Sequence, residues 1–139
     1  MELHIEQGPI LDLANKPIGV VTGISGPLWW TVKLKGMAGH TGSVPMPIRK
    51  DALVGAAEII IAVNEIATQV PENPTVGTVG TLNIFPASRN IIPEEVTFTV
   101  DLRDIDLERR NRYEKQLRDK IESITKKHNL TYSNQYSHW

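Results

Sequence analysis

The chain has 139 residues, of which 40% are hydrophobic, a net charge of −1 and no cysteine. This size and composition suit one domain with a proper core, and the near-neutral charge argues against general affinity for nucleic acid or anionic membranes. The lack of cysteine excludes disulfides, cysteine–zinc sites and thiol catalysis, and with neither a signal segment nor an apolar run of about 20 residues we expect a cytoplasmic protein.

Residues 1–26 contain two strand patterns. In residues 2–7 apolar side chains alternate with acidic ones and His4, and Gly-Pro ends the run. A second apolar run, 17–25, is also followed by Gly-Pro. Two strands without partners would not be stable alone, so we expect residues 1–26 to form a unit distinct from residues 27–139.

Four strands and two helices are predicted after residue 26. The segments 28–36, 75–85, 95–104 and 130–136 have the alternation or apolar run of strands, and in 95–104 one face is apolar while the other carries threonines, Asp101 and Arg103. Helical spacing predicts a first helix that ends before Pro71, with the stripe Leu53, Ala56, Ala57, Ile60 and Asn64.

The second helix is expected to start after Asp104 or Asp106 as N-cap and to stop near residues 127–129, where Asn129 suits the C′ position. Its stripe is Tyr113, Leu117, Ile121 and Ile124. The order β-α-β-β-α-β predicts an α+β, ferredoxin-like sandwich, because two helices on one face of a four-stranded antiparallel sheet bury both stripes most simply.

Two histidines are candidate site residues. His4 has no second histidine at HxH, HxxxH or HxxEH spacing, and a lone strand histidine is more often structural or merely exposed. His40 lies in a glycine-rich loop between a strand and a helix. Such a loop allows close approach to a ligand, although it is equally typical of a flexible connection.

Asn90 and Arg103 form a second candidate set. Asn90 lies in the turn before the strand 95–104, and Arg103 is near the end of that strand. An arginine fork with an asparagine amide suits a carboxylate. Because Arg103 stands between Asp101 and Asp104, a surface salt bridge is the alternative, and the residues alone favour it.

Five separated motifs occur in the order known from one family: "ELHIEQGP", "GMAGHTGSVPM", "RKDAL", "RNIIPEEV" and "TVDLRD". Together they resemble the amidase/hydantoinase-carbamoylase family of dinuclear zinc hydrolases, which includes N-carbamoyl-L-amino acid hydrolase, allantoate amidohydrolase and β-ureidopropionase. This family is related to acetylornithine deacetylase and succinyl-diaminopimelate desuccinylase. "GPLW" followed by "RKDALVGAAE" looks most like the bacterial L-carbamoylases.

The resemblance implies roles for the candidate residues. His4 would be a ligand of one zinc and Gln7 would reach the substrate. His40 would stabilise the developing oxyanion, while Asn90 and Arg103 would grip the substrate carboxylate. The family uses two divalent metal ions (zinc, manganese, cobalt or nickel), but its other ligands have no counterpart in this sequence. We therefore expect a piece of a longer enzyme that by itself holds no catalytic metal and is inactive.

By the same resemblance, residues 1–26 are the end of the zinc-binding catalytic domain and residues 27–139 are a lid that makes a homodimer. The expected reaction is cleavage of the carbamoyl C–N bond of N-carbamoyl-L-amino acids; allantoate or β-ureidopropionate is the alternative substrate. A non-catalytic dimerisation and binding module is the alternative from another class.

The dimer contact expected from the sequence is the first helix, through its small residues Ala52, Gly55, Ala56 and Ala62. We also expect Asn90 to approach Arg103 through the bend at Pro93, so that both surround one carboxylate. Whether His40 serves its own active site or that of the partner is left open by the sequence.

Overall fold

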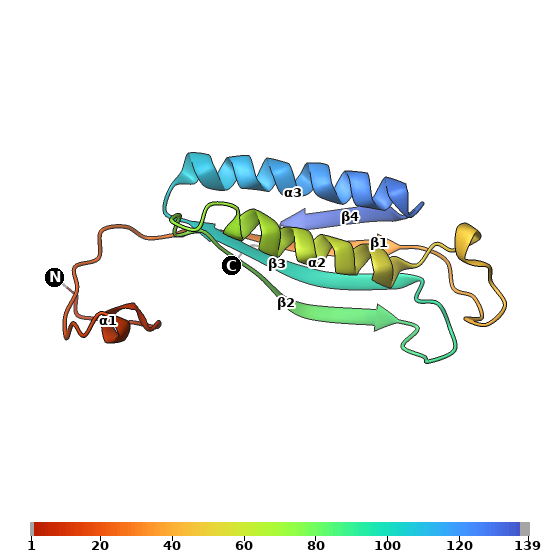
Figure 1. The fold of residues 1–139 in the computed structure, drawn as a ribbon, viewed down its shortest axis with the longest axis horizontal. Coiled ribbons are helices and arrows are strands. Elements are labelled where there is room, and N and C mark those ends of the chain that lie inside the picture. Colours follow the sequence, from red (N-terminus) through yellow and green to blue (C-terminus); the bar gives the residue numbers. More distant parts are fainter. Residues whose placement is uncertain (1, 137–139) are drawn as a thin grey trace.

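The computed structural model describes residues 2–136. Its elements are α1 (Ile10–Leu13), β1 (Gly26–Lys35), the 3-10 turn η1 (Met46–Ile48), α2 (Ala52–Thr68), β2 (Val76–Phe85), β3 (Glu95–Asp104), α3 (Leu107–Lys127) and β4 (Thr131–Tyr136). The four strands form one antiparallel sheet in the order β2-β3-β1-β4. Figure 1 shows α2 and α3 on the same face of this sheet. The predicted α+β, ferredoxin-like sandwich is confirmed.

The core lies between the sheet and the two helices. Every second residue of β3 is buried, from Val96 to Leu102, and β1 contributes Leu28, Trp30, Val32 and Leu34. The stripe predicted for α3 is also confirmed, because Tyr113, Leu117, Ile121 and Ile124 are all buried. These periods of two and 3.6 residues are read correctly from the sequence because each element contrasts an apolar face with a polar one.

Of the stripe predicted for α2, Ala56 is buried and Leu53 is partly buried against the core, but Ile60 is only partly buried and Ala57 and Asn64 are exposed, so the predicted stripe is largely wrong. The buried residues are Ala52, Gly55, Ala56, Ile59, Ala62, Val63, Ile66 and Ala67. Because α2 is apolar almost all round, the sequence allows several stripes, and the sheet selects the one whose small residues let the helix lie close. A side chain at Gly55 would meet Leu130 Cδ1 at 2.4 Å. The small residues expected at a dimer contact therefore face the chain's own core.

The strands predicted in residues 2–7 and 17–25 do not form in this structure. The segment contains one short helix, α1, and its backbone pairs with none of the four strands of the described sheet. Its apolar side chains, apart from the half-buried Leu11, are exposed, Leu3 to 95% and Val20 to 89%. A strand pattern becomes a strand only beside a partner edge, which accounts for the difference. Within residues 2–136, no helix has the length and apolar character that crossing a membrane requires.

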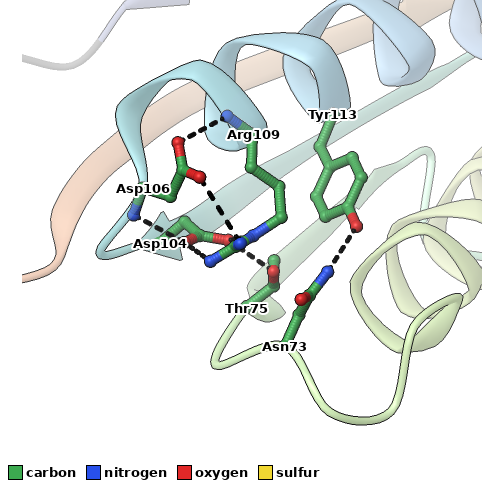
Figure 2. Close-up of polar contacts among 6 residues, drawn as sticks. All are labelled: Asn73, Thr75, Asp104, Asp106, Arg109 and Tyr113. Carbon is green, nitrogen blue, oxygen red and sulfur yellow. Dashed lines mark hydrogen bonds and ion pairs between the residues drawn. The ribbon is translucent and has the colours of Figure 1, made fainter.

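The turn between β3 and α3 is held by a buried carboxylate (Figure 2). Asp104 accepts two hydrogen bonds from Arg109, at 2.5 and 2.8 Å, one from the Thr75 hydroxyl and one from the Asp106 amide. Asp106 caps α3 by accepting from the Arg109 amide at 3.0 Å, as predicted. At the other end of α3, Asn129 has φ 53°, in agreement with the C′ position expected for it.

This network predicts a pH-dependent stability. Burial alone would raise the pKa of Asp104, but the hydrogen bonds from Arg109, Thr75 and the Asp106 amide outweigh it and lower the pKa to about 2. Because the folded pKa lies below that of the unfolded chain, the stabilisation is complete above pH 4–5 and is lost as the pH falls toward 2. We expect Asp104 to contribute about 2 kcal/mol in this window.

Urea unfolding of wild type and Asp104→Asn between pH 2 and 6 measures this contribution. The two unfolding free energies should differ most near pH 6 and converge at low pH, where Asp104 is protonated. The control is Asp119→Asn, because the Asp119 carboxylate is mostly exposed and is ion-paired with the exposed Lys115. Parallel curves for wild type and Asp104→Asn would contradict the assignment.

Candidate functional site

His40 and Asn90 lie in two loops that pair at one end of the sheet. His40 forms an isolated antiparallel bridge with Ile91. The Thr41 amide donates to the Asn90 carbonyl at 3.1 Å, and the Ile92 amide donates to the Gly39 carbonyl at 2.8 Å. In Figure 1 these two loops lie together at the end of the molecule opposite the N-terminal segment. The fold therefore brings these two predicted site residues together, although 50 positions separate them.

The hydrogen bond on the His40 ring determines its donor atom. The Gly42 amide donates to Nδ1 at 3.0 Å, so Nδ1 is the acceptor nitrogen. In a neutral imidazole the other nitrogen then carries the proton. His40 is exposed, which leaves this Nε2–H available to an external acceptor. A side chain at Gly42 would approach the His40 ring to 3.2 Å, so a glycine at this position suits the close contact.

Arg49 holds the loop that carries His40. Its Nε donates to the Val44 carbonyl at 2.9 Å and its Nη2 to the Thr41 carbonyl at 2.5 Å. The loop is thus fixed by side-chain contacts on both sides of residues 42 and 43, and it is not merely a flexible connection. The sequence assigns no role to Arg49 because its partners are backbone carbonyls, which leave no trace in a residue pattern.

Asn90 also presents donors outward. Its Oδ1 accepts from the Ser88 hydroxyl at 2.8 Å, which leaves the Nδ2 hydrogens free for another acceptor. The side chain is exposed. His40 and Asn90 thus supply N–H donors at the same end of the sheet, and this arrangement suits an oxygen that carries negative charge.

Arg103 lies at the opposite end of the sheet. It pairs with Pro27 on β1 and Val76 on β2, whereas Glu95, at the start of β3, follows the loop of Asn90. Arg103 lies eight positions along this extended strand from Glu95, a distance of about 26 Å. The expectation that Asn90 approaches Arg103 within one chain is therefore wrong. The bend at Pro93 comes before β3, and β3 itself is extended from residue 95 to residue 104.

Arg103 is engaged by Asp101 on the sheet face that the helices leave uncovered. Its Nε donates to Oδ1 at 2.8 Å and its Nη2 to Oδ2 at 2.6 Å. The guanidinium also lies 5.9 Å from the centre of the Trp29 ring. The side chain remains 43% exposed, and a shallow groove beside it is lined by Trp29, Thr78, Gly80, Thr99 and Asp101. The salt bridge that the residues alone favoured is present, and it leaves part of the arginine accessible.

The His4 ring makes one hydrogen bond within its own segment. Its Nδ1 lies 2.6 Å from the Ile5 carbonyl, which makes Nδ1 the donor and leaves the Nε2 lone pair free. Glu6 is occupied, because its carboxylate accepts from the amides of Ile10 and Leu11 at the start of α1. No group of three metal-binding side chains occurs anywhere in residues 2–136. Among the described residues His4 therefore belongs to no cluster of three such side chains, and its role as a metal ligand stays a prediction.

His4 and Gln7 belong to the segment that enters the sheet at Gly26. Gly26 pairs with Asp104, next to Arg103. The side chains of His4 and Gln7 are both exposed. The chain therefore joins its N-terminal segment to the Arg103 end of the sheet, while the His40 and Asn90 loops lie at the far end.

Comparison with known proteins places this fold in a family. The profile of the peptidase dimerisation domain matches residues 22–129. An N-carbamoyl-L-amino-acid amidohydrolase of Pseudomonas sp. (strain NS671) is 53% identical over 94% of this chain and 32% of its own length. A ureidoglycolate hydrolase of Arabidopsis thaliana is 43% identical over 96% of this chain and 28% of its own length.

Solved structures agree with this relation. A hydantoinase/carbamoylase family amidase from Burkholderia multivorans superposes with a TM-score of 0.93 at 38% identity, over 97% of this chain and 33% of that structure. The chain spans about a third of the length of these relatives. It belongs to the peptidase dimerisation domain family, in the form found in hydantoinase/carbamoylase family amidases.

Proposed function

We propose that this chain is the dimerisation and substrate-binding part of a longer, metal-dependent amidohydrolase that cleaves the carbamoyl C–N bond of N-carbamoyl-L-amino acids. The observation that carries this is a set of exposed N–H donors, on His40, Asn90 and Arg103, whose other polar atoms are already engaged inside the chain. Such donors suit a substrate with a carboxylate and a carbonyl on which charge develops. The 53% identity to a named N-carbamoyl-L-amino-acid amidohydrolase supports the substrate class.

In this proposal Arg103 and Asn90 bind the substrate carboxylate, and the His40 Nε2–H donates to the oxyanion. His4 is one ligand of a metal pair, and Gln7, on the same segment, reaches the substrate. When bound, two divalent metal ions supply Lewis acidity and an activated water. This chain's own contribution is to orient the substrate and to stabilise charge.

We further propose that one active site takes residues from two chains of a homodimer. Within one chain, β3 separates Arg103 from the His40 and Asn90 loops by about 26 Å, too far for one small substrate. His4 and Gln7 belong to the segment that enters at the Arg103 end. Each site would then combine His4, Gln7 and Arg103 of one chain with His40 and Asn90 of its partner. We assign the dimer contact to the exposed side of α2, with Val54 and Ile61, and to β2, one of the two edge strands of the sheet.

Other ureido substrates are the second candidate, because relatives at 43% and 42% identity are named ureidoglycolate hydrolase and allantoate deiminase. The test is release of ammonia by the full-length, metal-loaded protein from N-carbamoyl-L-amino acids, allantoate, ureidoglycolate and β-ureidopropionate. We expect the highest kcat/KM with an N-carbamoyl-L-amino acid. A higher value with another ureido acid would replace the substrate, and no turnover with any of them would favour a non-catalytic binding module.

A further inference from the structure

Asp101 and Arg103 are fixed to one another by the strand that carries both. Residues two apart on a strand point to the same face, and here Asp101 receives the Nε and Nη2 edge of the guanidinium at 2.8 and 2.6 Å. Trp29 lies opposite Asp101 on β1, donates a side-chain hydrogen bond to its carboxylate and lies beside the guanidinium. The Nε–Nη2 edge of Arg103 is therefore held by the Asp101 carboxylate, and Trp29 in turn holds that carboxylate in place.

This engagement leaves a defined part of Arg103 free. Guanidinium has five N–H donors in a rigid plane. Asp101 uses Nε–H and one Nη2–H, so the second Nη2–H and a neighbouring Nη1–H point away from Asp101 as a parallel pair. A pair of this kind matches the two oxygens of a second carboxylate. The side chain's exposure of 43% leaves this edge room for such a ligand.

We propose that Asp101 is the positioning residue for substrate binding, which holds Arg103 so that its free Nη1–Nη2 edge meets the substrate carboxylate. The proposal rests on the proposed function, in which Arg103 grips that carboxylate. The hydrogen bonds from Arg103 lower the pKa of Asp101, so this carboxylate is charged at neutral pH.

The direction in which Asp101→Asn changes KM distinguishes a positioning role of Asp101 from a simple charge effect. Asp101→Asn removes a negative charge close to the anionic substrate, so a charge effect alone would lower KM. Positioning predicts the opposite, because an unheld arginine must lose its rotamer freedom on binding substrate. We expect KM to rise about 10- to 30-fold, with kcat nearly unchanged.

The experiment compares the full-length enzyme with its Asp101→Asn and Arg103→Lys variants on an N-carbamoyl-L-amino acid and on the matching carboxamide, which lacks the charge. Both variants should raise KM for the acid and leave the amide unaffected. Glu95→Gln is the matched control, because Glu95 lies on the same face of β3 and is ion-paired with Lys33 at 2.6 Å, away from Arg103. It should leave KM unchanged.

A second measurement needs no activity. In the 139-residue chain, the Arg103 Nε–H should exchange slowly with water in nitrogen-proton spectra, and Asp101→Asn should abolish this protection while Glu95→Gln preserves it. If Arg103→Lys raises KM but Asp101→Asn lowers it or leaves it unchanged, positioning is overturned and the proposed function stands. A kinetically silent Arg103→Lys, with Nε–H protection intact, would instead overturn the proposed function and the role in binding that depends on it.

Discussion

Mixing two inactive variants of the full-length enzyme, His40→Ala and Arg103→Ala, is expected to restore about a quarter of the wild-type activity if subunits exchange freely. Each variant alone should lose about a hundredfold or more, because removal of one oxyanion donor or of the carboxylate clamp has an effect of this size. In a mixed dimer, one site takes Arg103 from the His40→Ala chain and His40 from the Arg103→Ala chain. That site is intact, while the other carries both changes.

The matched control is a mixture of His40→Ala with Asn90→Ala. Both residues lie at the same end of the sheet, so each site of the mixed dimer receives one of the two changes and no activity should return. Ammonia release after co-expression of the two chains measures both mixtures. No recovery in the His40 and Arg103 mixture would show that each site is built from one chain. Recovery in the control would show that His40 and Asn90 reach one site from different chains, against the arrangement proposed here.

Gly36→Ala is expected to destabilise the 139-residue chain by at least about 3 kcal/mol or to prevent folding. Gly36 follows β1, and its amide donates to the Glu94 carbonyl at 2.6 Å. A Cβ at this position would lie 1.9 Å from the Lys50 carbonyl oxygen and 2.8 Å from its carbon. Backbone atoms cannot move aside as the end of a side chain can. The chain at Gly36, after β1, and the chain at Lys50, before α2, cross closely here, and this crossing would have to open to admit a Cβ.

Urea unfolding followed by circular dichroism measures this effect. Gly80→Ala and Gly8→Ala are the controls, because the first would meet nothing closer than Thr99 Oγ1 at 3.8 Å and the second nothing within 4 Å. Both should change the unfolding free energy by less than about 0.5 kcal/mol. A Gly36→Ala chain as stable as these controls would contradict the packing described for this crossing. The result also bears on the site, since the same crossing leads into the loop that carries His40.

The sequence by itself determined the βαββαβ order, the faces of β1 and β3, and the stripe and both ends of α3. These features are local, because an alternation, a helical stripe or a cap is set by neighbours a few residues apart. It failed for α2, which is apolar on nearly every side, and for residues 2–25, whose strand patterns have no partner edge among the described residues.

The site shows the same division. The residue types at His40, Asn90 and Arg103 are visible in the sequence, and so is their chemistry. Only the tertiary structure decided that the His40 and Asn90 loops lie together while Arg103 lies about 26 Å away. The extended strand β3 places residues 95 and 103 far apart, whereas the pairing of two loops brings residues 40 and 91 together although they are distant in sequence. The tertiary structure also decided the hydrogen-bond partners of each side chain. Arg49, for example, donates to backbone carbonyls of the loop before it, and no local residue pattern encodes such contacts.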